Sequence, residues 1–369
     1  MGSQPTVEDM GLTLFGNIYH GRRVLVTGHT GFKGSWLAMW LSQMGAEVIG
    51  ISLSPETSPN HFDLLKLDIE DIRLDIRDRD NLTRALTKKR PEMVFHLAAQ
   101  PLVRRSYHNP VDTWATNVMG TAHLLDACRK IESLRSIVVI TTDKCYQNHG
   151  WPWGYREIDT LGGHDPYSAS KAAVELLVAS YRESFMSGPD APLLATARSG
   201  NVIGGGDWAE DRLIPDLIRS LFNNKVLEIR SPYSTRPWQH VLESLSGYLF
   251  LNQKLFLGER RFAEAWNFGP SPDGKKTVQD ILSFLKNFWP QIQWHVTSNT
   301  QPHEAHLLYL DSSKAHSELS WTPVWDWEDA LTYTAEWYLS YLSGKVESGL
   351  QLQRYLQDAE AIGASWCLQ

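Results

Sequence analysis

The sequence predicts an α/β protein built on a doubly wound parallel sheet, with a smaller mixed α/β unit toward the C-terminus. Short apolar runs alternate with segments of helical apolar spacing as far as Asn201, and a glycine-rich turn joins the first run to the first helix. After Asn201 the chain changes to irregular segments rich in Gly, Pro, Trp and Arg. Strands that alternate with helices are typical of a parallel sheet, because each return to the same sheet edge needs a crossover connection.

The expected elements follow in chain order. The first βαβ unit is made of the strand RRVLVTG, the helical segment GSWLAMWLSQMG and the strand AEVIGISL. The pattern continues with the strand MVFHLAAQ, a helix from about Asp112 to Lys130, the strand SIVVITT, a helix from Tyr167 to about Phe185 and the strand LLATARSGN. Further helices are expected at LIPDLIRSLF, SLSGYLFLNQKL and TVQDILSFLKNF, each with apolar residues at helical spacing.

Composition points to a small-molecule partner. The chain has 369 residues, a formal charge of -7 and a pI near 6.0, so we expect no general attraction to nucleic acid or to an anionic membrane. No apolar run approaches the roughly 18 residues of a membrane span, and the first residues do not have the pattern of a signal peptide. Cys128, Cys145 and Cys367 match neither a zinc site nor a disulfide framework. We therefore expect a cytoplasmic protein with buried thiols and no metal.

The turn VLVTGHTGFKG carries the first functional motif. Glycines at 28, 31 and 34 form a GxxGxxG pattern between a strand and an amphipathic helix. In this setting the backbone can approach a pyrophosphate at the helix N-terminus, as in a Rossmann fold; an ordinary tight turn is the alternative. Lys33 could reach a cofactor phosphate or ribose, or could point into solvent. The residues of this turn expected to contact a dinucleotide are Gly28, His29, Gly31, Phe32, Lys33 and Gly34.

The end of the second strand bears on the choice of dinucleotide. Ser52 and Ser54 stand where NAD-binding proteins usually place an acid for the adenosine ribose, and no arginine stands there to hold a 2′-phosphate. We therefore expect NAD, with weaker ribose contacts than usual. Other expected cofactor contacts are Asp75 and Ile76 in LDIRD, which could cover the adenine, and Leu97, Ala98 and Ala99 after the strand MVFH.

The segment DPYSASKAAVELL contains a Tyr-x-x-x-Lys pair, Tyr167 and Lys171, on one helical face. Such a lysine can stabilise tyrosinate and lower the phenol pKa, so that Tyr167 can exchange a proton with an alcohol while hydride moves to nicotinamide. The pair alone is a weak signal, but the glycine turn and the strand-end Thr142 strengthen it. We expect Thr142 to hydrogen-bond the same substrate hydroxyl.

From about Arg23 to Ala330 the sequence resembles the extended short-chain dehydrogenase/reductases. The segments TGHTGFKGSW, HLAAQPLVRRSY, TTDKCYQN, GGHDPYSASK, RSGNVIGGGDWAEDRLIPD and TRPWQHVLE are similar to the nucleotide-sugar 4,6-dehydratases that act on CDP-glucose. The resemblance implies that NAD oxidises C4 of the sugar, water leaves across C5 and C6, and hydride returns to C6, on the route to deoxyhexoses of bacterial surface polysaccharide. It also implies a homodimer or a dimer of dimers, in which the helices near 112–130 and 167–185 form a four-helix bundle.

The turn TTDKCY would then supply the groups for water elimination. In the related thymidine-nucleotide enzymes the positions that match Asp143 and Lys144 are an Asp and a Glu. This chain therefore keeps the candidate acid, Asp143, but has Lys144 in place of the Glu. Lys144 can act as the C5 base only if its pKa falls from about 10.4. Otherwise Lys144 positions the sugar or a water molecule. Without the resemblance, these residues would be ordinary turn residues at a strand end.

Several residues are candidates for substrate contact. Arg236 has the planar donor geometry that suits a diphosphate, and Asn201 contacts the nucleotide-sugar phosphates by resemblance. For any arginine taken singly, a surface ion pair is the common alternative. His303, Glu304 and His306 could suggest a metal site, but a contact with sugar or nucleotide is preferred. The complete set of expected substrate contacts is Gln100, Arg104, Asn201, Arg212, Arg236, His303 and Glu304.

We expect a dinucleotide-binding domain over 21–200 and about 237–269, a substrate domain over about 201–236 and 270–345, and a C-terminal tail over 346–369. Two other functions stay open at this point. A sugar-nucleotide 4-epimerase would share the glycine turn, Thr142, Tyr167 and Lys171, but it needs no elimination pair. A non-catalytic dinucleotide sensor would not need the Tyr-Lys pair.

Overall fold

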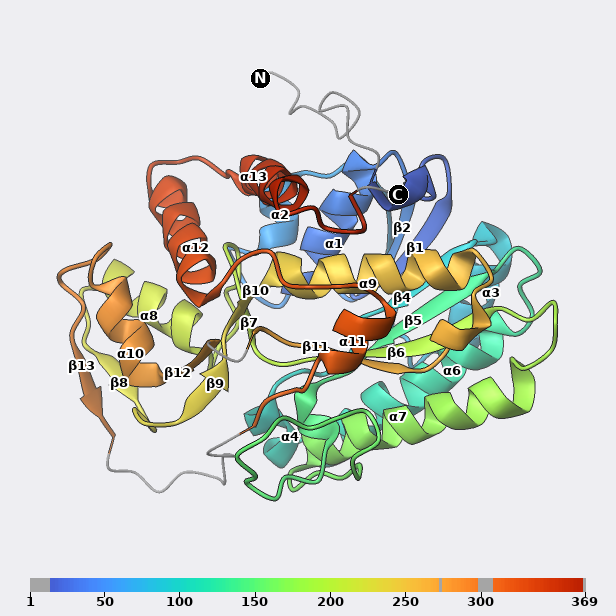
Figure 1. Ribbon diagram of the computed structural model, residues 1–369, viewed down its shortest axis with the longest axis horizontal. Helices are drawn as coiled ribbons and strands as arrows, with labels where there is room; N and C mark the ends of the chain where they lie inside the picture. The colour runs from blue at the N-terminus through green and yellow to red at the C-terminus, as the bar shows by residue number, and fades with distance from the viewer. Residues whose placement is uncertain (1–13, 272–273, 298–307, 368–369) are drawn as a thin grey trace.

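A computed structural model of the protein describes residues 14–271, 274–297 and 308–367. Its centre is a seven-stranded sheet in which every strand pairing is parallel (Figure 1). From one edge to the other its strands are β11 (Ala265–Phe268), β6 (Leu193–Ser199), β5 (Ser136–Ile140), β4 (Met93–His96), β1 (Arg23–Thr27), β2 (Glu47–Ser52) and β3 (Glu70–Arg73). The order runs outward from β1 in both directions, so the predicted doubly wound parallel sheet is confirmed.

Each strand of the sheet centre is buried on both faces. Val24 and Val26 of β1 belong to the larger hydrophobic core, whereas Leu25 between them belongs to a second core on the opposite face. This alternation follows from the two-residue repeat of a strand, and a strand covered on both faces needs a continuous apolar run. Helices α1 (Phe32–Gln43) and α9 (Val241–Phe256) cover one face, and α3 (Arg79–Lys89), α6 (Gly120–Cys128) and α7 (Pro166–Phe185) cover the other (Figure 1).

The helix predicted from about Asp112 to Lys130 is present, but it is not uniform. It consists of α5 (Pro110–Trp114), a π-helical turn (Ala115–Met119) and α6. In the π turn the Asn117 amide pairs with the backbone of Gln100 and also donates to Ser170 of α7 at 2.9 Å. A π turn often marks a functional position in a helix, and here it lies where the helix passes the end of β4.

The other predicted helices are all present; the limits of LIPDLIRSLF match those of the structure, and those of the others shift by one to a few residues. The remaining helices of the described chain are α2 (His61–Leu65), α4 (Val103–His108), α8 (Leu213–Phe222), α10 (Val278–Leu285), α11 (Ser313–Glu318), α12 (Trp327–Leu342) and α13 (Ser348–Ala361). Short 3-10 segments lie at Leu14–Asn17, Asp143–Cys145 and Arg260–Phe262. No helix in these described ranges combines the length and the apolar character needed to cross a membrane.

A second region of mixed structure lies to the left of the main sheet in Figure 1. It contains α8, α10 and three two-stranded sheets. Those sheets pair β7 (Val202–Ile203) with β10 (Gln239–His240), β9 (Thr235–Pro237) with β12 (Lys275–Thr277), and β8 (Leu227–Ile229) with β13 (Trp294–Val296). The domain limits stated above remain a prediction.

The C-terminal segment packs against the main body of the protein. Helix α13 contributes Leu352, Tyr355 and Leu356 to the larger core. Beyond it the Trp366 ring stacks on Phe15 with 5.2 Å between ring centroids. Residues 346–367 of the segment predicted as a tail are therefore part of the folded structure. All three cysteines are free and buried, as predicted.

Candidate active site

A cleft of about 1150 Å³ runs along the carboxyl ends of β1, β4, β5 and β6 and is closed on the far side by residues of the second region. In doubly wound folds this edge is where ligands bind. The predicted site residues that line it are Gly28, Gly31, Phe32, Lys33, Gly34, Asp75, Ile76, Leu97, Ala98, Ala99, Gln100, Arg104, Thr142, Asp143, Lys144, Tyr167, Lys171, Asn201, Arg212 and Arg236. His303 and Glu304 lie outside the described residues.

The glycine turn has the shape that a pyrophosphate requires. Gly28 has a positive φ of 77°, and a Cβ there would lie 2.7 Å from the Ala98 nitrogen. At Gly34 a Cβ would lie 2.1 Å from the Gly28 oxygen, so the turn and helix α1 can approach closely only without side chains. Gly31 is the N-cap of α1 and supplies no side-chain cap, which leaves the amide donors of the first helical turn available to a ligand. These residues fit a dinucleotide phosphate.

His29 does not line the cleft, so its side chain is not placed to contact a cofactor bound there. Its ring is fully buried, and its Nε2 lies 2.9 Å from Asp71 Oδ1. The ring occupies the space beside Gly50, where a Cβ would come within 2.5 Å of it. Burial lowers the pKa of His29, against the opposing effect of Asp71. The side chain therefore supports the turn from behind.

Lys33 points into the cleft rather than into solvent. Its ammonium donates to Ser199 Oγ at 2.6 Å and to the Tyr248 hydroxyl at 3.4 Å. Burial, together with the positive charges of Arg212 and Lys144, lowers the pKa of Lys33 to about 7, while Asp143 acts in the opposite direction. A lysine on the first turn of α1 therefore reaches the carboxyl end of β6.

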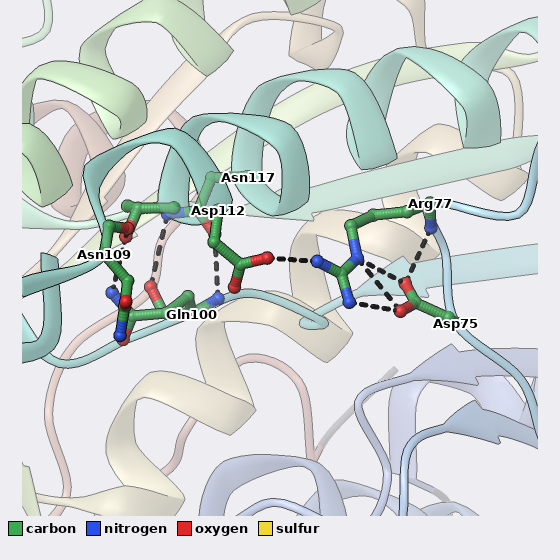
Figure 2. Close-up of polar contacts among 7 residues, drawn as sticks. Asp75, Arg77, Gln100, Asn109, Asp112 and Asn117 are labelled. Atoms are coloured by element: carbon green, nitrogen blue, oxygen red, sulfur yellow. Dashed lines mark hydrogen bonds and ion pairs between the residues drawn. The ribbon is translucent and has the colours of Figure 1, made fainter.

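The loop after β3 is tied to the helical layer beside it. Figure 2 shows that the Asp75 carboxylate faces Arg77, which donates to it from Nε at 2.9 Å and also reaches Asp112 of α5. The hydrogen bonds from Arg77 are the main cause of the lowered pKa of Asp75. Asp75 and Ile76 both line the cleft, as expected for a loop that covers one end of a cofactor.

Gln100 lines the cleft, but its amide is engaged within the protein. The side-chain oxygen accepts from the Leu102 backbone at 2.7 Å, and the nitrogen donates to Thr113 Oγ1 at 3.0 Å. Figure 2 also shows the backbone of Gln100 paired with Asn117 of the π turn. The Gln100 side chain therefore stabilises the wall of the cleft. Both of its polar atoms already have partners within the protein, so a contact with substrate would require it to rearrange.

Sequence reasoning found no arginine at the end of the second strand, but Arg73 of the neighbouring strand β3 lies there. Ser52 and Arg73 are partners across the parallel pair β2–β3, and Arg73 donates to the Leu53 carbonyl at 3.0 Å. The arginine therefore stands near the end of the second strand although it is distant in sequence. It does not line the cleft, because its guanidinium turns to Asp71 at 2.6 Å.

Thr142, Tyr167 and Lys171 come together in the middle of the cleft. The Thr142 hydroxyl lies close enough to Tyr167 to lower the phenol pKa, and Lys171 Nζ donates to the Ile140 carbonyl at 3.1 Å. Burial, with the positive charge of Lys33, lowers the pKa of Lys171 to about 8. The expected lowering of the phenol pKa is not seen, because burial raises the pKa of Tyr167 more strongly than Thr142 and Arg212 lower it.

Asp143 and Lys144 lie in the same turn and face one another. Asp143 is 2% exposed and accepts from Thr142 Oγ1 at 3.0 Å. Lys144 Nζ lies 3.7 Å from Asp143 Oδ1 and 3.5 Å from Asn201 Oδ1. A buried carboxylate, an amine and an amide therefore share one side of the cleft, within reach of the Tyr167 region.

Arginines gather at the outer part of the cleft. Arg212 is held by Asp207 at 3.0 Å, and Asp207 is the main cause of its raised pKa. Arg104 pairs with Asp211 at 2.9 Å, which bridges the two sides of the cleft mouth. Sequence reasoning missed Arg105 and Arg230, which also line the cleft. The available signals were that Arg105 is adjacent to Arg104 and that Arg230 lies six residues before Arg236.

The loop at 204–212, which carries Asp207 and Arg212, is anchored by α12 from outside. A Cβ at Gly205 would lie 1.9 Å from the Trp337 ring, so the helix packs directly onto the loop backbone. The Tyr338 hydroxyl donates to the Asp207 carbonyl at 2.6 Å. The position of the arginine therefore depends on the C-terminal helices.

The doubly wound sheet, the glycine turn and the Thr142–Tyr167–Lys171 cluster define an enzyme of the extended short-chain dehydrogenase/reductase class. A family model described as GDP-mannose 4,6 dehydratase matches residues 25–257. The chain is 47% identical, over 89% of its length and 94% of the relative, to the CDP-glucose 4,6-dehydratase of Salmonella typhimurium. The chain belongs to the GDP-mannose 4,6-dehydratase family of sugar-nucleotide dehydratases.

Solved structures support the fold. An epimerase from Methanothermobacter thermautotrophicus superposes with a TM-score of 0.78 at 23% identity, covering 89% of this chain and 95% of that one. The dTDP-glucose 4,6-dehydratase DesIV from Streptomyces venezuelae gives a TM-score of 0.73 at 24% identity, covering 86% and 97%. At this level of identity the likeness establishes the shared fold, and the choice between epimerase and dehydratase depends on the site.

Proposed function

We propose that the protein is a CDP-glucose 4,6-dehydratase that uses NAD and forms CDP-4-keto-6-deoxyglucose. The observation that carries this proposal is the placement of Asp143 and Lys144 in one turn with Thr142, beside Tyr167. Elimination of water needs a proton donor and a proton acceptor in addition to the groups that oxidise C4. The 47% identity to a named CDP-glucose 4,6-dehydratase supports the same reaction.

The glycine turn and the loop at Asp75 would hold NAD along the inner part of the cleft. When bound, NAD would take up hydride from C4 of the sugar and return it to C6. The protein's contribution to the oxidation is a proton acceptor: Tyr167 takes the proton of the C4 hydroxyl, and Thr142 holds that hydroxyl in line. Lys171 keeps a positive charge near the phenolate that forms.

Asp143 would protonate the departing 6-hydroxyl once the C4 ketone has made the C5 proton acidic. Its carboxyl is held by the Thr142 hydroxyl and is nearly fully buried, so its direction is fixed. Lys144 is the candidate for the C5 base, or it positions the sugar together with Asn201. Incubation of Lys144→Met with substrate in deuterium oxide separates the two roles: slow entry of deuterium at C5 indicates a base, whereas weak binding with normal exchange indicates positioning.

The arginines at the cleft mouth would bind the diphosphate of the substrate. Arg212 and Arg236 line the cleft on the side of the second region, and Arg104 lines the opposite side. A guanidinium offers two parallel donors to a phosphate, which suits a diphosphate that spans the cleft. Cytidine is proposed from the named relative rather than from these arginines, because in the proposed arrangement they would contact only the phosphates.

Incubation with CDP-glucose followed by alkali tests the proposal. A 4-keto-6-deoxy product absorbs in the near ultraviolet after alkali, whereas a 4-epimerised sugar does not. UDP-glucose and dTDP-glucose at the same concentration serve as matched controls for the base. The alternative of a 4-epimerase is supported if CDP-glucose disappears without the keto product, and a sensor is supported if it binds and stays unchanged.

We also propose that two copies of the chain pair through the surface formed by α5, the π turn and α7. Large apolar side chains are exposed there, although neighbouring ones are buried in the second core. They are Val111, Trp114, Met119, Leu176 and Phe185. Sedimentation should show a homodimer or a dimer of dimers at micromolar concentration. Leu176→Asp should shift it toward monomer, whereas Ile158→Asp, at an exposed apolar position elsewhere, should not.

A cytoplasmic location is part of the proposal. The three cysteines are free and buried, which suits a reducing compartment.

A further inference from the structure

A buried ion pair that the proposed reaction does not use lies behind the active-site turn. Glu175 is on α7, one turn beyond Lys171, and Arg198 is on β6. Their side chains are each 3% exposed, and Arg198 Nη2 lies 2.8 Å from Glu175 Oε2. Tyr167, Lys171 and Glu175 follow at intervals of four residues, so they share one face of the helix.

The Glu175 carboxylate holds the chain just before the turn. Its Oε1 accepts from the Thr141 hydroxyl, and its Oε2 accepts from Thr196 Oγ1 at 2.7 Å as well as from Arg198. Burial alone would raise the pKa of Glu175, but Arg198 and the two hydroxyl donors outweigh burial and leave that pKa below its ordinary value. The carboxylate is therefore ionised and fully hydrogen-bonded.

Arg198 holds the chain just after the turn. Its Nη1 donates to the Tyr146 hydroxyl at 2.6 Å and to the Glu157 carbonyl at 3.2 Å, and its guanidinium lies 4.9 Å from the centre of the Tyr146 ring. The Tyr146 hydroxyl in turn donates to Asn267 Oδ1 at 2.8 Å. One ion pair thus contacts Thr141 on one side of the turn and Tyr146 on the other.

We propose that the Glu175–Arg198 pair is a positioning device for the catalytic turn. The four residues between its two attachment points are Thr142, Asp143, Lys144 and the buried Cys145. The pair fixes them against the helix that carries Tyr167 and Lys171. This inference rests on the proposed function for the chemistry that is positioned, but the clamp itself is a property of the fold.

A purely stabilising role does not account for this arrangement. A buried ion pair contributes little net stability, and apolar residues of similar volume often replace one without loss of stability. Displacement of a catalytic group by about 1 Å, however, can cost roughly 10²-fold in rate. The expected effect of removing the pair is therefore on the rate of turnover and not on binding.

Two variants and one control test the proposal. In the double variant Glu175→Leu with Arg198→Met, kcat for CDP-glucose should fall roughly 10²-fold. In Tyr146→Phe, which keeps the ring and removes only the hydroxyl, kcat should fall about tenfold. In both, KM should stay within about threefold of the wild-type value, because the glycine turn and the cleft arginines Arg104, Arg212 and Arg236 are untouched. Tyr19→Phe removes a buried hydroxyl bonded to the Leu249 carbonyl, away from the cleft, and should leave kcat unchanged.

Hydrogen exchange measured on the same proteins makes the test independent of the substrate. The amides of residues 142–146 should lose protection in Tyr146→Phe and in the double variant, but not in Tyr19→Phe. The inference would be overturned if the double variant and Tyr146→Phe kept the wild-type kcat and the wild-type amide protection of residues 142–146. It would also be overturned if Tyr19→Phe lost as much of either as they do. If the double variant does not fold, Tyr146→Phe decides alone. If wild-type protein leaves CDP-glucose unchanged while the exchange pattern holds, the proposed function fails and the clamp stands.

Discussion

Replacing Lys33 by Met should make the protein more stable, and the gain should depend on pH. The Lys33 ammonium is held inside the cleft by Ser199 and Tyr248, close to the positive charges of Arg212 and Lys144. Met has a similar volume and no charge. Ser199 keeps a partner after the change, because the Tyr248 hydroxyl donates to it at 2.7 Å. The substitution therefore removes a buried charge without leaving a buried hydroxyl unpaired.

The size of the gain follows from the shift of the Lys33 pKa, which falls from 10.5 to about 7. At about 1.4 kcal/mol per pH unit, a shift of this size costs the folded state about 5 kcal/mol when the unfolded chain is fully protonated. Lys33 as a whole is half-buried, and solvent screening reduces the figure to about half. We expect Lys33→Met to be more stable by about 2 kcal/mol at pH 6 and about 1 kcal/mol at pH 9.

The sign follows from proton linkage. The folded state holds the Lys33 proton less tightly than the unfolded state, so the cost is fully present below about pH 7 and disappears as the pH rises toward 10.5. Thermal unfolding at pH 6, 7, 8 and 9 should show a melting-temperature difference that shrinks from about 3 °C to about 1 °C. Lys88→Met, at an exposed lysine of α3, is the control. A difference that does not change with pH, or one as large in Lys88→Met, would refute the reasoning.

Three further predictions concern the reaction. Tyr167→Phe should keep CDP-glucose and NAD binding by calorimetry while turnover falls roughly 10²-fold or more, because the proton acceptor for C4 oxidation is lost; turnover at the wild-type rate would contradict this. Asp143→Asn should slow water loss by roughly 10²- to 10⁴-fold and let the 4-keto sugar that still carries its 6-hydroxyl accumulate, as detected by borodeuteride reduction and mass spectrometry; absence of that sugar would place Asp143 in the oxidation step. The rate of turnover should fall as the pH rises through about 8, where Lys171 loses its proton, and Lys171→Arg should lack this alkaline limb in its pH–rate profile whatever its absolute rate.

Local patterns were enough to predict the sheet, the glycine turn and the Tyr167–Lys171 face. Each depends on spacing within one segment: two residues in a strand, about four in a helix, and three between the glycines. The right-handed βαβ crossover restricts the strand order but does not fix where the winding reverses, and the edge strands β3 and β11 were not among the expected strands. The positions of Thr142 and Asp143 could be predicted, since a residue just after a buried strand must lie at the sheet edge.

Other features depend on contacts between distant segments and could not be read from local patterns. His29 turns away from the cleft because Gly50 of the neighbouring strand leaves room for its ring. Lys33 turns inward because Ser199 of β6 and Tyr248 of α9 offer it oxygen partners. The ion pair of Glu175 with Arg198 joins a helix to a strand, and neither residue belongs to a motif with a fixed spacing.

Through the contact between Gly205 and Trp337, the packing of α12 determines the position of a loop that lines the cleft. No side chain can be added at 205 without moving α12, since a Cβ would overlap the indole at 1.9 Å. Substitutions that shift α12 would instead move the backbone that carries Asp207 and Arg212, although they touch no ligand. Selection for a different nucleotide sugar can therefore act on the packing face of α12, and a library aimed at substrate range should include Trp337 and Tyr338 besides the residues that line the cleft.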